Sequence, residues 1–156
     1  MVKATHAYIR KDNKTLFLLR NKKEKDVHEG KYIGVGGKME KNETPDECID
    51  REIFEETGLK VISKKLRGKI FFPEFDGEND ILMYTYTVDK FEGELSECNE
   101  GSLEWVDDKD MFRLPMWQGD PVFLKWIYEG SEYFEATFNY VDGKFIDYSV
   151  EKGDVE

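Results

Sequence analysis

One stretch of the chain carries complete signals for both ends of a helix. Thr44 is followed by Pro45 and Glu47, and Gly58 closes the stretch. A Thr-x-x-Glu capping box satisfies free amides at a helix start, and proline is favoured at the first helical position. Glycine ends helices because it adopts a left-handed conformation without strain. The spacing predicts a helix over residues 45–57, and any fold of this chain has to bury one side of it.

Three glutamates share one side of that helix. A helix turns by about 100° per residue, so Glu52, Glu55 and Glu56 occupy an arc of roughly 100° beside the apolar stripe of Ile49. Like charges at this spacing repel by about 0.2–0.5 kcal/mol per pair, and Arg51 is expected beyond the arc. Two interpretations stay open: a solvated acidic face, as on many surface helices, or a site where Mg²⁺ or Mn²⁺ neutralises the carboxylates and binds substrate phosphates.

The rest of the chain alternates β-branched and aromatic runs with turn signals. A second helix is expected from Pro121 to Glu129, with Asp120 as its N-cap and Gly130 as its terminator. The pair Asp142-Gly143 favours a tight hairpin. The expected strands span residues 2–10, 15–20, 32–35, 70–72, 81–88, 103–106, 133–140 and 144–150. Together these elements predict an α+β fold, a mixed sheet layered with two helices.

Length and charge exclude several classes of protein. The 156 residues suit one domain over residues 1–150, and residues 151–156 are expected to fray. With 34 acidic and 23 basic residues the formal net charge is −11, so nucleic acids and anionic membranes are poor partners. No signal peptide and no apolar run of about 18 residues is present, which favours a cytoplasmic protein. Cys48 and Cys98 are expected to be thiols.

The region around the first helix resembles the sequence box of the Nudix hydrolase family. That box runs glycine, five residues, glutamate, seven residues, arginine-glutamate, an apolar residue, any residue, two glutamates, any residue, glycine and an apolar residue. Its places are filled without departure by Gly37, Glu43, Arg51, Glu52, Ile53, Glu55, Glu56, Gly58 and Leu59.

The resemblance implies an α/β/α sandwich around a mixed sheet and a hydrolase that cuts a phosphoanhydride bond in a nucleoside diphosphate derivative. Glu52, Glu55 and Glu56 correspond to the metal-binding glutamates of the family. A main-chain carbonyl near Gly36 or Gly37 is implied as a further ligand. Mg²⁺ is the implied cofactor, with Mn²⁺ as a substitute, and it activates a water for in-line attack.

The same resemblance implies supporting roles for other residues. Arg51 and Glu43 correspond to the pair that orients the glutamates, and Lys38 is placed to meet a phosphate. The general base stays open between Glu52, from the box, and Glu100, because related enzymes often recruit an acidic residue from a later loop. Glu100 is then a metal ligand too, whereas its alternative role is that of a solvated loop side chain.

Beyond the box, the chain resembles MutT-type nucleoside triphosphate pyrophosphohydrolases, so (8-oxo-)dGTP is the expected substrate. In that group a Trp stacks on the base and an Asp reads its edge. Trp117 and Asp120 stand in the matching segment, with core packing and helix capping as their alternative roles. His28 is a further candidate for the base site. Ile33 and Gly119 replace polar residues of the mammalian enzymes, which leaves the preference for oxidised bases open.

Several alternatives remain. Arg20, Lys22 and Lys23 form a basic cluster that either steers phosphate or is ordinary surface. ADP-ribose pyrophosphatases tend to carry a proline about fifteen residues after the box, and Pro73 lies fourteen after Leu59. The alternative that is not an enzyme is a nucleotide-binding sensor that keeps the fold but does not turn over its ligand. The protein is expected to be a monomer or a weak homodimer.

Overall fold

The computed structural model describes residues 1–22, 28–130 and 132–153. In these ranges it contains two α-helices, α1 (Pro45–Thr57) and α2 (Asp120–Glu129), and one 3₁₀-helix, η1 (Asp108–Arg113). The described strands are β1 (Val2–Lys11), β2 (Lys14–Leu19), β3 (Tyr32–Ile33), β4 (Val35–Lys38), β5 (Lys60–Phe72), β6 (Ile81–Glu92), β7 (Ser102–Asp107), β8 (Tyr133–Val141) and β9 (Lys144–Gly153).

All of these strands join one mixed sheet in the order β3-β2-β1-β6-β5-β8-β9, with β4 paired to β1 and β7 paired to β2. The pairs β1–β6 and β5–β8 are parallel, and the other pairs are antiparallel. The predicted α+β fold with a mixed sheet is therefore confirmed.

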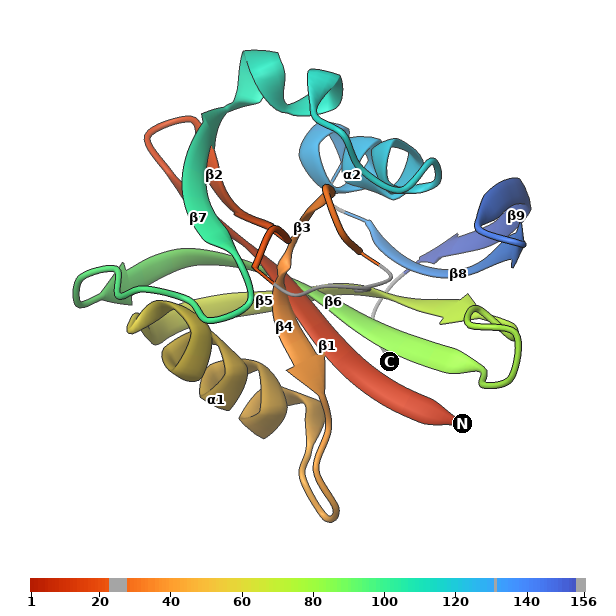
Figure 1. The fold of residues 1–156 in the computed structure, drawn as a ribbon, viewed down its shortest axis with the longest axis horizontal. Helices are drawn as coiled ribbons and strands as arrows, with labels where there is room; N and C mark the ends of the chain where they lie inside the picture. Colours follow the sequence, from red (N-terminus) through yellow and green to blue (C-terminus); the bar gives the residue numbers. More distant parts are fainter. Residues whose placement is uncertain (23–27, 131, 154–156) are drawn as a thin grey trace.

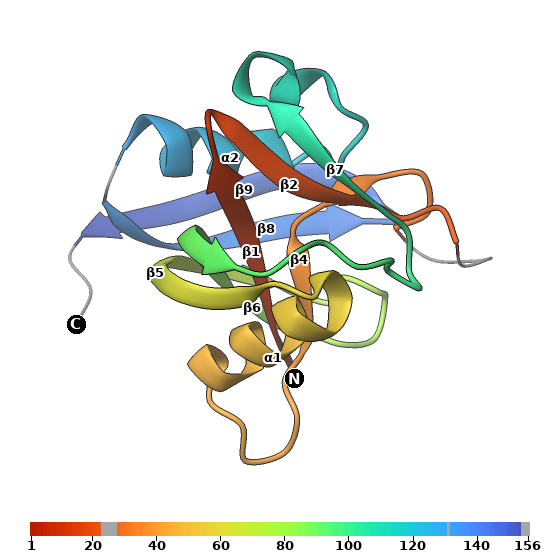
Figure 2. The same cartoon turned by 90° about the vertical axis from the view of Figure 1, so that its left-hand side faces the viewer.

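The two helices cover opposite faces of the sheet, as Figures 1 and 2 show. Successive residues of a strand point to opposite faces. On β1, Tyr8 packs with Phe123 of α2, whereas Ile9 packs with Ile49 of α1. Fully burying an apolar side chain of this size contributes about 1.5–3 kcal/mol, so the alternation along β1 fixes both layers at once.

Helix α1 begins and ends at the predicted residues. The Glu47 amide donates to the Thr44 hydroxyl (3.1 Å), and the Thr44 amide donates to the Glu47 carboxylate (3.0 Å). At the other end Gly58 adopts φ 80°, and its amide donates to the Phe54 carbonyl. The geometry of this helix is thus set by local sequence.

Strand β5 differs most from the prediction, because only residues 70–72 were expected in it and it begins at Lys60. Its pairing with β6 shifts register near Ser63 and again between Leu66 and Gly68. A β-bulge moves the following side chains to the other face. The period-two pattern that reveals a strand is therefore interrupted in this part of β5.

Two element ends also differ from the prediction. Asp120 is the first residue of α2 and not its N-cap, since Gly119 holds that place and no side chain caps the helix. Gly130 ends α2 as predicted, in an extended conformation. β9 continues to Gly153, so residues 151–153 pair with β8 and do not fray; residues 154–156 lie outside the described ranges.

Both cysteines are buried free thiols, as expected. Burial raises the pKa of Cys48 to about 11, which keeps the group protonated at neutral pH. Within the described part of the chain, no helix is long and apolar enough to cross a membrane.

Candidate active site

Strand β4 carries two glycines at close approaches, Gly36 to the main chain of β1 and Gly37 to a side chain of α1. A Cβ built on Gly36 would lie 2.0 Å from the Thr5 carbonyl oxygen, and one on Gly37 would lie 2.6 Å from the Glu52 carboxylate. The Gly36 amide donates to Glu56 Oε2 (3.3 Å). The glycines therefore bring main-chain polar groups and two helix carboxylates into one place.

Arg51 is the centre of an ion-pair network on this side of α1. Its guanidinium donates to both oxygens of Glu43 (2.7 and 2.9 Å), to Glu52 Oε1 (2.7 Å) and to Glu55 Oε2 (3.2 Å). The expectation that Arg51 lies beyond the acidic arc was wrong for its charged group, because the long side chain reaches back across the helix surface. The fork of Arg51 also holds the pKa of Glu43 down at about 2, chiefly through hydrogen bonding.

The three box glutamates lie at different depths. The side chain of Glu55 is 57% exposed and that of Glu52 is 15% exposed, whereas Glu56 is buried. Burial, followed by the neighbouring Glu100, raises the pKa of Glu56 to about 9, and burial also raises the pKa of Glu52. The fold thus brings Glu100 to the box and forces carboxyl groups together, an arrangement that calls for a proton or a cation.

The donor set fits a hard divalent ion. Carboxylate oxygens and a glycine carbonyl are the ligands that Mg²⁺ and Mn²⁺ prefer. The ligand shell is not preformed: among the described residues, no three acidic, histidine or cysteine side chains already surround a common point. Arg51 draws Glu52 and Glu55 toward itself while Glu56 turns to Gly36, so an ion would compete with Arg51 for the same oxygens.

The predicted phosphate-binding cations have different surroundings. Lys38 is exposed at the end of β4, and its carbonyl accepts from Arg51. Arg20 lies 3.8 Å from Glu100, whose carboxylate it partly neutralises. The Lys22 ammonium donates to the Cys98 carbonyl (2.8 Å), and Lys23 lies outside the described residues.

Trp117 is surrounded by side chains from distant parts of the chain. Its indole N–H donates to His28 Nδ1 (2.8 Å). The rings of Phe75 and Tyr140 meet it edge-on, with centroids at 4.9 and 5.6 Å. Ile33 lies opposite Leu18 in the sheet and packs on the same core as Trp117. The structure therefore brings together Trp117, His28 and Ile33, the residues that the sequence assigned to a base.

Asp120 lies behind Trp117 at the start of α2. Burial raises its pKa to about 8, against the opposing effects of a main-chain hydrogen bond from Trp117 and the charge of Lys31. At neutral pH the carboxyl is therefore mostly protonated and able to donate. Gly119 next to it is sterically required, since a Cβ there would lie 2.7 Å from both Phe138 and Tyr140.

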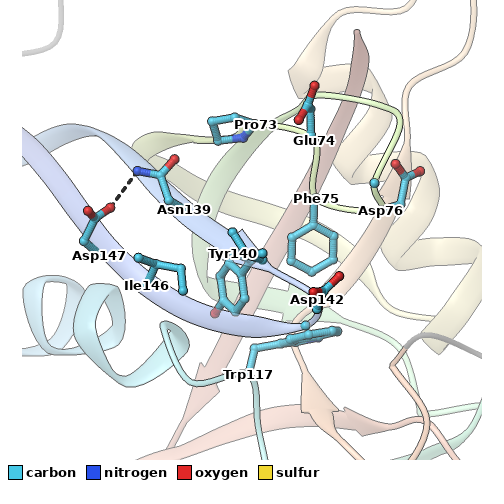
Figure 3. A pocket seen from close by; sticks show the side chains of 13 residues that line it. Pro73, Glu74, Phe75, Asp76, Trp117, Asn139, Tyr140, Asp142, Ile146 and Asp147 are labelled. Carbon is cyan, nitrogen blue, oxygen red and sulfur yellow. Dashed lines mark hydrogen bonds between the residues drawn. The ribbon is translucent and has the colours of Figure 1, made fainter.

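An open hollow of about 690 Å³ adjoins this aromatic group. Figure 3 shows Phe75, Tyr140 and Trp117 on its wall, between the β5–β6 connection and the β8–β9 hairpin. Asp76, Asp142 and the other carboxylates at its rim make the entrance acidic. A planar ring fits such a wall better than a phosphate does.

Sequence reasoning missed Phe75 and Tyr140. Phe75 follows the strand end at Pro73, and Tyr140 lies near the tip of the last hairpin. Aromatic residues at strand ends were the available signal, but it gave no hint that the two rings meet Trp117.

Comparison with known proteins agrees with this geometry. The NUDIX domain family model matches residues 2–127. An uncharacterised Nudix hydrolase, YvcI of Bacillus subtilis (strain 168), is 32% identical over 142 residues, covering 88% of this chain and 86% of that protein. The oxidized purine nucleoside triphosphate hydrolase of Danio rerio is 36% identical over 66% of each chain.

A solved structure shows the same fold. The MutT protein from Bacillus halodurans superposes with a TM-score of 0.87, at 27% identity, over 97% of this chain and 98% of that one. The family match runs from the start of β1 to residue 127, within α2, and it includes the Arg51 network and the glycines of β4. The chain therefore belongs to the Nudix hydrolase family and is a MutT-like member of it.

Proposed function

We propose that this enzyme hydrolyses a nucleoside triphosphate, dGTP or 8-oxo-dGTP, to the monophosphate and pyrophosphate. The observation that supports it most is that Glu52 and Glu56 lie against the β4 glycines. Arg51 donates to Glu52 and so orients it. A buried acidic group of this kind binds a polyanion only together with cations. The aromatic side chains around Trp117 would bind the nucleobase of the substrate.

Glu52, Glu55, Glu56, Glu100 and the Gly37 carbonyl would hold Mg²⁺, for which Mn²⁺ can substitute. When bound, the ion neutralises phosphate charge and lowers the pKa of a water. Glu52 is proposed as the general base, with Glu100 as the second candidate. The Glu52 carboxylate accepts from Arg51 through Oε1 (2.7 Å) and lies beside Gly37.

Lys38, Arg20 and Lys23 are proposed to contact the phosphates, with Lys38 the most open of the described pair. Arg51 acts indirectly as a positioning residue, since it binds Glu43, Glu52 and Glu55 but not the substrate. Gly58 ends α1 at a fixed residue, which sets the depth of the glutamates relative to β4.

At the base end, Trp117 is proposed to stack, Asp120 to read the base edge, and His28 and Ile33 to line the site. Ile33 offers no hydrogen bond and position 119 has no side chain, so the site lacks two polar groups that would report an oxidised base. We therefore expect kcat/KM for dGTP and 8-oxo-dGTP to agree within about tenfold, because strong discrimination requires buried polar partners.

A second candidate substrate is ADP-ribose. The ADP-ribose pyrophosphatase of Methanocaldococcus jannaschii is 35% identical over 71% of this chain, and Pro73 lies on the wall of the hollow. The size of the hollow is compatible with either a base or a second sugar.

The test is a substrate panel of dGTP, 8-oxo-dGTP and ADP-ribose with Mg²⁺, with products identified by chromatography. Release of pyrophosphate from the triphosphates supports the proposal. Release of inorganic phosphate, or cleavage of ADP-ribose alone, contradicts it. Size-exclusion chromatography with light scattering checks the proposed monomer or weak homodimer, and cell fractionation checks the proposed cytoplasmic location.

A further inference from the structure

Trp117 is closed to solvent in this structure, although the proposed function uses it as a stacking surface. The residue is only 8% exposed. The planes of the Phe75, Tyr140 and His28 rings make angles of 66°, 90° and 86° with the indole. None of these rings is parallel to the indole, so none takes the position of a stacked base.

Lys31 lies over the indole instead. Its ammonium group is 4.5 Å from the ring centroid of Trp117, within the range of a cation–π contact. This contact covers a ring face, which is the surface that a base needs. The sequence assigned no role to this side chain.

The main chain of Lys31 is fixed while its side chain is long and flexible. The Lys31 amide donates to the His28 carbonyl (3.0 Å), and its carbonyl accepts from the Arg20 amide (3.1 Å). The next amide, of Tyr32, donates to the Pro115 carbonyl (2.8 Å), two residues before Trp117. Lys31 is thus tethered beside the indole, and its four-carbon stem can swing away from the ring face that the ammonium covers.

We propose that Lys31 is a specificity-determining residue that covers Trp117 in the free enzyme and competes with the nucleobase for the indole face. The inference rests on the proposed function, because it requires a base to stack on Trp117. The same competition weakens binding of the monophosphate product and so favours its release.

The test measures binding of two non-hydrolysed ligands in the presence of Mg²⁺ by calorimetry. α,β-Imido-dGTP carries a base, and inorganic tripolyphosphate carries only phosphates. A cation–π contact of ordinary strength predicts that Lys31→Ala binds α,β-imido-dGTP about threefold to tenfold more tightly than wild type. Lys31→Arg keeps a cation over the ring and should stay within about twofold of wild type.

Tripolyphosphate affinity should be unchanged in both variants. Lys109→Ala, an equal charge change at an exposed residue of η1, is the matched control and should leave both affinities unchanged. Acrylamide quenching of tryptophan fluorescence is the second readout, and it should rise in Lys31→Ala because an indole face becomes accessible. Unchanged far-UV circular dichroism shows that the variants are folded.

Three outcomes overturn the inference. Weaker binding of α,β-imido-dGTP alone makes Lys31 a base ligand, weaker binding of both ligands makes it a phosphate ligand, and unchanged binding of both removes its role. Failure of the proposed function looks different, because wild type itself would then bind tripolyphosphate but not α,β-imido-dGTP.

Discussion

The acidic side of α1 and the aromatic wall around Trp117 lie in one molecule but are assembled in different ways. Glu43, Arg51 and Glu52 come from one short segment, and Arg51 reaches each carboxylate from the same helix or the loop before it. Trp117 meets Phe75 from the β5–β6 connection and Tyr140 from the end of β8. Local sequence therefore determines the first site, whereas the second exists only when the whole sheet has formed.

The two regions also differ in how their carboxyl groups are surrounded. At α1 the guanidinium of Arg51 binds the partly exposed carboxylates of Glu52 and Glu55. Glu56 is buried beside Glu100. At Trp117 burial, and next the nearby carboxyl of Asp120, raise the pKa values of Tyr8 and Tyr140, and the ammonium of Lys31 lies over the indole. We expect changes at the first region to alter turnover and changes at the second to alter substrate affinity.

The largest expected effect comes from Glu56→Gln. Removal of a metal-binding carboxylate should lower kcat by at least about 100-fold. The fold should survive, because burial and the neighbouring Glu100 raise the pKa of Glu56, so a neutral side chain at this position relieves repulsion. Steady-state kinetics with Mg²⁺ and a thermal melt without it check both statements. Glu129→Gln, at the exposed end of α2, is the control, and wild-type turnover that persists in excess chelator would contradict the metal role.

The two glycines of β4 separate activity from stability. Gly37→Ala puts a methyl group against the movable Glu52 carboxylate, so kcat should fall about 10- to 100-fold while the melting temperature changes little. Gly36→Ala puts it against the Thr5 main chain, so the free energy of unfolding should fall by about 2–4 kcal/mol. Kinetics and denaturant unfolding of both variants measure the contrast. An equal loss of stability in the two would show that Glu52 is as rigid as main chain.

At the aromatic wall, Trp117→Ala should raise KM for dGTP about tenfold and change kcat by less than about threefold, since stacking on one aromatic ring contributes about 1–3 kcal/mol. Trp105→Ala is the comparison variant, because Trp105 packs against Phe91 in the α1 layer. A large fall in kcat for Trp117→Ala would mean that this region also positions the reacting phosphate.

The smallest effect concerns pH and Asp120. Its pKa rises from 3.8 to about 8 on folding, so between these values the folded protein binds more protons than the unfolded chain. The free energy of unfolding therefore falls as pH rises through this window, by at most about 1.4 kcal/mol per pH unit. Asp120→Asn removes this contribution, and its slope should be shallower by about 1 kcal/mol per pH unit in urea unfolding at pH 5, 6 and 7. Parallel slopes for the two proteins would place Asp120 in an ionised state.

Elements whose ends are set by local contacts could be predicted from the sequence. The capping box at Thr44 and the left-handed Gly58 act within a few residues, so the bounds of α1 were predicted correctly. β5 was predicted too short because bulges near Ser63 and Gly68 interrupt its alternation. Asp120 was assigned as a helix cap because an aspartate before a proline has that local preference, but α2 begins at Asp120 itself and Gly119 is its N-cap.

By itself, the sequence determined the acidic helix, its cap residues and the glycines beside it, because each depends on contacts between near neighbours in the chain. The tertiary structure alone decided that Glu100 meets Glu56 and that Lys31 covers Trp117. Those contacts join segments whose separation in space depends on strand order and register. A pattern of residue types does not reveal that separation, because it is set by the packing of the whole sheet.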